Sequence, residues 1–227
     1  EIAAMKDHLK LLKALGSDVM VFAETTGEII NQVGAGISKR PKLASAAEWR
    51  QLGQRFTQVA EHLLENGVRM AVHHHMGTVI ETAEEVDRLL ENSGAAVGLL
   101  LDTGHMTFSG GDPVAVAKRH AKRIVHVHCK DIRRYALAAC RRRDVSFSEA
   151  VLCGIFTAPG DGMVDFAALA GAPAGAQLML YDINNRGQVV GEWNSRPFVW
   201  SGAGGVQFLA GSGFAEHVNE LGQVALM

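Results

Sequence analysis

The sequence predicts an α/β fold with a parallel sheet, followed by a small β-rich segment. Short apolar runs alternate with amphipathic, helix-like segments along residues 1–170, the pattern of a parallel sheet with helical crossovers. Each of these apolar runs ends in a histidine or a carboxylate. An Ala- and Gly-rich linker at 171–176 then leads into a segment at 177–227, where short β-like runs are separated by glycines.

The predicted helices have apolar residues at helical spacing between recognisable ends. The first spans 2–15 and stops at Gly16, because glycine commonly follows the last helical residue. A long helix is expected over 49–64 and a shorter one over 83–90. A fourth begins at Asp112-Pro113, since an aspartate cap followed by proline is a strong start signal.

Four buried strands are expected between these helices, over 18–24, 68–72, 97–101 and 124–127. They are rich in Val, Leu and Ile, as is typical of parallel strands covered on both faces. Parallel strands end at one edge, both in open sheets and in (β/α)8 barrels. The residues that close the four runs should therefore share one rim: Glu24, His73, Asp102 and His128.

Charge and composition favour a small-molecule partner. The formal net charge is −2, which argues against general binding of nucleic acid or anionic membranes. The stretch 118–143 contains ten Lys and Arg with only Asp131 against them. We interpret it as solvated helix faces, because Tyr135 is the one aromatic residue interleaved with it.

Other features bear on the compartment. The three cysteines lack Cys-x-x-Cys spacing, so neither a zinc ribbon nor a disulfide framework is indicated, and a reducing cytoplasm fits best. No run is long and apolar enough to span a membrane, and no secretory leader is visible. The chain begins at Glu1 within an amphipathic pattern, so we interpret it as a fragment. Its oligomeric state is left open.

Three strings, 72–77, 101–105 and 126–131, hold six of the ten histidines. Imidazole and carboxylate together suit a catalytic divalent metal. In the first string, strand alternation places His73 and His75 on one side and His74 on the other.

In the second string, Asp102 is the expected ligand, and its alternative role is to cap the following segment through backbone amides. Gly104 is expected in a strand-to-loop turn, with a conformation that other residues resist.

The third string places His126, His128 and Lys130 on one face. We expect His126 to be a buried histidine satisfied by a backbone carbonyl, and His128 to enter the site. Lys130 is suited to holding a substrate oxyanion or hydroxyl. Glu24 is a candidate general base or substrate contact.

Five motifs of the first domain have the order and spacing of a known family. They are Ala-Val-His-His-His-Met-Gly-Thr (71–78), Leu-Leu-Asp-Thr-Gly-His (100–105), Gly-Gly-Asp-Pro (110–113), Ile-Val-His-Val-His-Cys-Lys-Asp (124–131) and Thr-Ala-Pro-Gly-Asp-Gly (157–162). Together they resemble the inosose dehydratases of myo-inositol catabolism, within the sugar isomerase/epimerase and endonuclease IV-like barrel superfamily. The resemblance covers residues 1–170.

The resemblance implies a partial (β/α)8 TIM barrel that lacks its first two and last strands. It implies a divalent metal, manganese or cobalt, and dehydration of the cyclitol 2-keto-myo-inositol to a trihydroxycyclohexane-dione. The implied metal ligands are His73, Asp102 and His128. The implied substrate contacts are His105, Arg133 and Arg134, and the candidates for proton transfer and catalysis are His75, Glu24 and Lys130.

The β-rich segment contains an internal repeat. The octapeptide at 182–189 returns at 217–224, with Asn, Gly, Gln and Val kept in place, and resembles HAF-type repeats of bacterial surface proteins. Between the copies, 196–200 and 206–209 are expected to be strands. Two partial copies are not expected to stand alone.

Three alternatives follow from the same patterns. The first is an isomerase or epimerase on the same barrel, and the second is a non-catalytic truncated or fused chain. A DNA-repair nuclease is a third, which the near-neutral charge disfavours. Because a partial barrel leaves strand edges unpaired and lacks a further carboxylate ligand, we expect an incomplete metal site and impaired activity.

Overall fold

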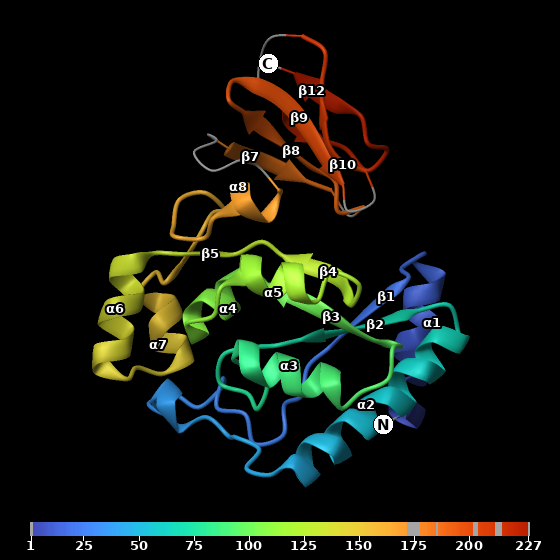
Figure 1. Ribbon diagram of the computed structural model, residues 1–227, viewed down its shortest axis with the longest axis vertical. Helices are drawn as coiled ribbons and strands as arrows, with labels where there is room; N and C mark the ends of the chain where they lie inside the picture. The colour runs from blue at the N-terminus through green and yellow to red at the C-terminus, as the bar shows by residue number, and fades with distance from the viewer. Residues whose placement is uncertain (1, 172–177, 185, 202–203, 212–214, 227) are drawn as a thin grey trace. The chain divides into compact units, whose positions relative to one another are not determined.

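The computed structural model describes residues 2–171, 178–184, 186–201, 204–211 and 215–226. The chain divides into two compact units, Glu1–Thr157 and Ala158–Met227 (Figure 1). Apart from Gly171, the expected linker at 171–176 lies outside the described residues.

The first unit is built on a parallel sheet, as predicted. Its strands are β1 (Val19–Phe22), β2 (Arg69–His73), β3 (Val97–Asp102) and β4 (Ile124–His128), hydrogen-bonded in that order. The register pairs Phe22 with Val72, His73 with Leu100, and Asp102 with His128. The ends of neighbouring strands therefore lie side by side. The sheet is half of a barrel wall, confirming a TIM-barrel-like α/β fold.

The helices that the sequence predicts in this unit lie close to their expected positions. They are the short 3-10 helix η1 (Ile2–Met5), α1 (Lys6–Ala14), α2 (Ala46–Glu65), α3 (Ala83–Glu91) and α5 (Pro113–Arg119). Capping boxes start α2 at Ser45 and α3 at Thr82, while the Asp112 side chain accepts the Val114 amide at the start of α5. Gly16, with φ +75°, follows α1.

A continuous core joins α2 and α3 to one face of the sheet. The fully or nearly fully buried side chains of the helices include Trp49, Leu63 and Leu89, and those of the strands include Met70 and Leu99. Each such side chain contributes about 1.5–3 kcal/mol by leaving water. This packing fixes the strands on which the site residues lie.

Past β4 the structure departs from the strand-helix alternation. The elements are β5 (Asp131–Ile132), α6 (Arg134–Arg143), α7 (Phe147–Leu152) and β6 (Phe156–Thr157). A barrel lacking three strands would retain five, but the described residues form a parallel sheet of four. The two-residue strand β6 instead pairs antiparallel with β5.

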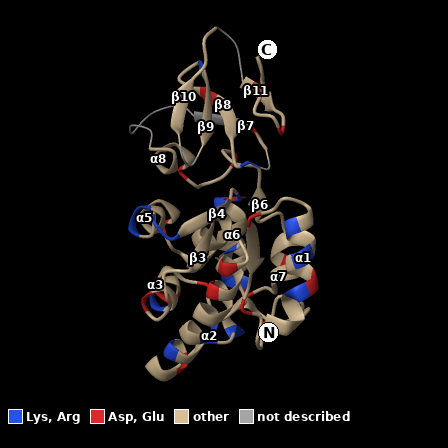
Figure 2. Cartoon of the chain, turned by 90° about the vertical axis from the view of Figure 1, so that its right-hand side faces the viewer, with Lys and Arg blue, Asp and Glu red and all other residues tan. Residues whose placement is uncertain are grey.

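The basic stretch 118–143 is divided among α5, β4 and α6, and blue segments mark α5 in Figure 2. Part of it is used inside the fold. Arg119 and His120 pair with Asp87 of α3, and the Arg123 guanidinium donates to the Val97 and Gly94 carbonyls. In the described part of the chain, no helix is long and apolar enough to cross a membrane.

The second unit is mainly antiparallel. It contains the short helix α8 (Phe166–Leu169) and a sheet ordered β10-β9-β8-β7. Its strands are β7 (Leu178–Ile183), β8 (Val189–Trp193), β9 (Arg196–Ser201) and β10 (Gly205–Phe208), and a hairpin of β11 (Ala215–Val218) and β12 (Val224–Leu226) follows. The strands expected at 196–200 and 206–209 are confirmed as β9 and β10.

Truncating the centre of the core tests the packing. Leu99 is 0% exposed on the helix-covered face of β3, so Leu99→Ala should lower the free energy of unfolding by about 2–5 kcal/mol. Urea denaturation followed by circular dichroism measures the change. The control is Leu152→Ala on α7, whose side chain is 87% exposed and should change stability little. Equal losses for both variants would contradict this core.

Candidate metal centre

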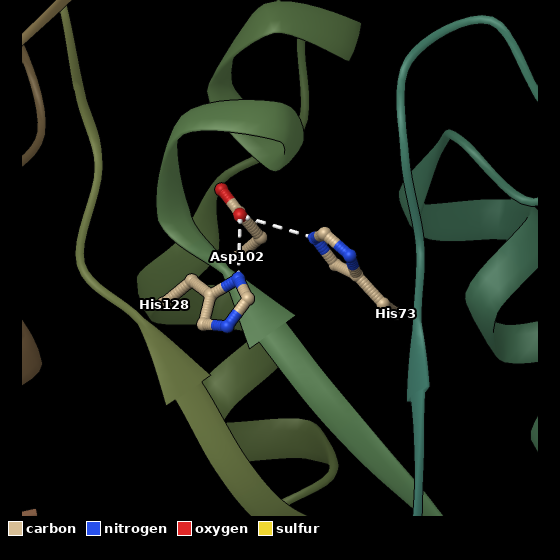
Figure 3. A group of neighbouring side chains, drawn as sticks. All are labelled: His73, Asp102 and His128. Carbon is tan, nitrogen blue, oxygen red and sulfur yellow. Dashed lines mark hydrogen bonds and ion pairs between the residues drawn. The ribbon is translucent and has the colours of Figure 1, made fainter. Parts of the chain in front are cut away.

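Three side chains meet at the carboxyl edge of the sheet. His73 ends β2, Asp102 ends β3 and His128 ends β4, and Figure 3 shows both imidazoles directed at the Asp102 carboxylate. His73 Nε2 lies 3.1 Å from Asp102 Oδ2, and His128 Nδ1 lies 3.3 Å from the same oxygen. The ligand atoms of all three lie within 4.8 Å of one another. The parallel register that pairs Asp102 with His128 produces this convergence.

Asp102 fulfils both roles that the sequence left open, with a different oxygen for each. Oδ1 accepts the His105 amide at 3.0 Å and so caps the helix that follows, while Oδ2 faces His73, His128 and the Lys130 ammonium. Burial acts to raise the Asp102 pKa, but His128, His73 and the neighbouring cations outweigh it and hold that pKa well below its usual range. The carboxylate is therefore ionised although it is fully buried.

The segment after Asp102 is a helix, α4 (Thr103–Ser109), so the expected strand-to-loop turn is wrong. Gly104 lies inside α4 and does not have a positive φ. Glycine is required there for space, because an added Cβ would lie 2.6 Å from the Cβ of Lys130. Close packing of α4 on the Lys130 segment thus brings Lys130 to the Asp102 carboxylate.

His74 supports the site from the other face of β2, a role that the sequence did not suggest. It is 0% exposed, and its Nε2 accepts the backbone amide of Asp102 at 3.1 Å. Burial lowers the pKa of His74 to about 3, so the ring is neutral and Nε2 can act as an acceptor. Strand alternation did predict that His74 faces away from its two neighbours, but not that it reaches the next strand.

His75 and His105 extend the cluster. Their ring centroids lie 3.7 Å apart, and His75 Nδ1 donates to the Met76 carbonyl at 2.7 Å when it carries the proton. Burial lowers the pKa of His75 to about 4 and that of His105 well below its usual value. A neutral His75 with its proton on Nδ1 leaves Nε2 free to accept a proton. Among the described hydrogen bonds, the buried His105 Nδ1 has no partner.

The other predicted residues lie in different surroundings. Glu24 follows β1, and its Oε1 accepts the Thr26 amide; no described contact joins it to Asp102. Arg133 donates to the Gly154 and Phe156 carbonyls, and Arg134 is exposed at the start of α6. Their functional roles stay predictions.

His126 corrects a second expectation. It shares a face with His128, as predicted, with ring centroids 5.4 Å apart. It is exposed, however, so the prediction of a buried histidine is wrong. The reason is topological: β4 is the outermost strand of the described parallel sheet, and no further parallel strand there covers it.

A buried ion-pair cluster holds the loop that carries His75. Glu81 Oε2 accepts the Gly77 amide at 2.7 Å and lies 3.3 Å from Arg40 Nε. Arg40 also donates to the Thr78 carbonyl and to Glu85. Burial raises the pKa of Glu81, and the Arg40 charge opposes that rise. The loop at 25–43 thus fastens the end of β2.

The residues present fit a divalent metal. Atoms bound about 2.0–2.1 Å from one ion lie about 3 Å apart, close to the 3.1 and 3.3 Å separations from Asp102 Oδ2. Two imidazoles and one carboxylate leave coordination positions for water or substrate, the composition of a catalytic site. The Lys130 ammonium already contacts the same oxygen, so positive charge is favoured at this point. His73, Asp102 and His128 would hold the ion.

Sequence and structure comparisons agree with this architecture. A profile of the xylose isomerase-like TIM barrel family matches residues 1–172, and the chain belongs to that family. Rhizopine catabolism protein MocC of Rhizobium meliloti is 54% identical over 169 residues, which cover 74% of this chain and 52% of that protein.

Inosose dehydratase of Lactiplantibacillus plantarum is 41% identical over 164 residues, covering 72% of this chain and 55% of the relative. The crystal structure of IolI protein with a bound zinc atom superposes with a TM-score of 0.51 at 18% identity, over 75% of this chain and 54% of that one. That likeness shows the fold. The chain spans about half the length of these curated relatives.

The Arg40 cluster can be tested by removing its cation. Arg40→Met leaves Glu81 and Glu85 without their buried partner, so the free energy of unfolding should fall by about 3–5 kcal/mol. Adding Glu81→Gln should recover part of the loss, because the uncompensated charge is then removed. Chemical denaturation of both variants measures this. A double variant no more stable than Arg40→Met would contradict the electrostatic explanation.

Proposed function

We propose that this chain carries the metal-binding part of a hydro-lyase whose substrate is the cyclitol ketone 2-keto-myo-inositol. The observation that carries the proposal is the convergence of His73, Asp102 and His128 at one strand edge, in a family with relatives named inosose dehydratase. The product would be a trihydroxycyclohexane-dione and water. A cytoplasmic location and a small-molecule partner belong to the same proposal.

The proposed ion is divalent manganese or cobalt, held by the same three residues. Imidazole nitrogen and carboxylate oxygen suit several divalent metals, and the crystal structure of IolI protein contains a bound zinc atom. When bound, the ion supplies Lewis acidity that polarises the ketone and makes the neighbouring C–H more acidic. His74 keeps the Asp102 backbone in place through its buried hydrogen bond.

His75 is the proposed base. Its lowered pKa keeps the ring neutral at pH 7, and the Met76 carbonyl fixes the proton on Nδ1, so Nε2 can remove a proton from the carbon beside the ketone. Glu24, the other candidate, has no described contact with the cluster, which favours His75. Loss of the β-hydroxyl as water then needs a proton donor at the leaving oxygen, so that the C–O bond breaks as the C=C bond forms.

Lys130 and His105 are the proposed groups for the substrate oxygens. The Lys130 side chain is 36% exposed, so its ammonium can face a bound hydroxyl as well as Asp102. His105 packs on His75 and has an Nδ1 atom without a described partner.

Metal titration tests the centre. Isothermal calorimetry with Mn²⁺ or Co²⁺ should show one ion per chain, and Asp102→Ala or His128→Ala should weaken binding by at least about 100-fold, since each removes a ligand. His8→Asn on the exposed face of α1 is the control and should bind as the parent does. An unchanged metal affinity in the Asp102 and His128 variants would contradict the proposed metal centre.

The base can be tested separately from the metal. His75→Asn should lower the rate of water loss from 2-keto-myo-inositol by about 10²- to 10⁴-fold, because no group then accepts the proton. Its metal affinity should stay near that of the parent. Proton NMR in D₂O follows the reaction and separates water loss from simple proton exchange. Exchange or epimerisation without water loss would favour the isomerase alternative.

A further inference from the structure

The repeated motif of the second unit folds into the same turn twice. In each copy the asparagine, Asn184 or Asn219, accepts with Oδ1 the backbone amides two and four residues later, at 2.9–3.0 Å. Its Nδ2 donates to the side-chain oxygen of Gln188 or Gln223 at 2.8 and 2.7 Å. The glycine between them has φ +69° in one copy and +81° in the other, which explains why it is kept.

The two turns stack on each other. Asn184 Nδ2 also donates to the Asn219 carbonyl at 2.9 Å, so its two hydrogens serve its own turn and the next one. Val190 is fully buried against Ala215 and Val218 of the following copy. The interface between the repeats therefore has two parts. The side-chain amide of an asparagine in one copy donates to the backbone carbonyl of the equivalent asparagine in the next, and apolar side chains of the two copies pack together.

The second copy presents the donating half of this interface to solvent. Asn219 Nδ2 donates to Gln223 alone among the described hydrogen bonds, which leaves one hydrogen for another acceptor. Ala225 occupies the position that Val190 holds in the first copy, and it is exposed.

The first copy carries the receiving half, in which Asn184 is 7% exposed as a whole residue and the neighbouring Ile183 is the accessible side chain. The Asn219 carbonyl accepts both Gly222 and Asn184, whereas the Asn184 carbonyl accepts only Gly187 in the described part of the chain. Ile183 occupies the position of Val218 and is 52% exposed. One molecule thus carries both complementary halves, each at a different copy of the motif.

We propose that a second copy of this chain docks here, with the Ile183–Asn184 turn of one molecule stacked on the Asn219–Ala225 turn of another. The internal stack supplies the template, and the receiving partner must offer an asparagine carbonyl beside an apolar residue at repeat spacing, which this chain does. The junction joins the two copies of one chain to the two copies of the next, so the stack exceeds the three or so repeats that such arrays need for stability. Because the two surfaces differ, the association is head-to-tail, and each added molecule presents a further docking surface.

The junction between molecules is weaker than the internal one. Within the chain, Asp182 Oδ2 accepts the Val218 amide at 2.9 Å, and the second copy has His217 at the position of Asp182. That hydrogen bond is therefore missing between molecules. Association should depend on concentration, and it is independent of the proposed chemistry of the first unit.

Sedimentation velocity on the full chain, from about 1 μM to about 1 mM, tests the proposal. The parent should grow in mass beyond a dimer as concentration rises. Ala225→Lys places a charge on the donating surface, and Ile183→Lys places one on the receiving surface. Each variant should therefore weaken association at least about tenfold. A mixture of the two variants should form a dimer, because one intact junction remains between them.

Three further measurements keep the test decisive. Asn219→Asp keeps the Oδ1 acceptor of the turn but loses the donated hydrogens, so it should weaken association while circular dichroism stays unchanged. Leu152→Lys, at an 87% exposed position of the first unit, should associate as the parent does. A parent that stays monomeric throughout, an association that ignores both lysine variants, or a mixture that fails to dimerise overturns the proposal.

Discussion

The buried charge of Asp102 is the constraint on which the first unit depends. A fully buried carboxylate is tolerated only where cations and donors surround it, and here they come from strands β2 and β4, helix α4 and Lys130. The parallel register brings His73 and His128 to it, and α4 begins on it. Fold and chemistry are thereby coupled, since the group that starts a helix is also the centre of the candidate site.

Much of this arrangement could be predicted from the sequence because it follows from periodicity. Apolar runs gave the four strands, capping residues gave the helix starts, and parallel strand ends implied that His73, Asp102 and His128 meet. Strand alternation also placed His74 opposite its neighbours. These are local or topological rules, and tertiary packing did not override them.

What could not be predicted depends on contacts between distant segments. Gly104 is needed because Lys130 approaches it, which no local pattern around Gly104 reveals. The exposure of His126 follows from the place of β4 as the outermost strand of the described parallel sheet, and the Arg40 cluster joins segments about 40 residues apart. In the second unit the repeat could be recognised in the sequence. The hydrogen bond from Asn184 to the Asn219 carbonyl could not, because it depends on how the two copies pack.

The Arg40 cluster has a consequence for how this protein tolerates change. Arg40 and Glu81 touch neither His73 nor Asp102 in the described contacts, yet they hold the backbone at Gly77, two residues past His75. Variation within the loop at 25–43 would then fall into two kinds. Solvent-facing positions should accept many substitutions. The few residues that anchor the loop should tolerate replacement as poorly as the histidines do, although in the described contacts they touch neither the proposed metal ligands nor the proposed base.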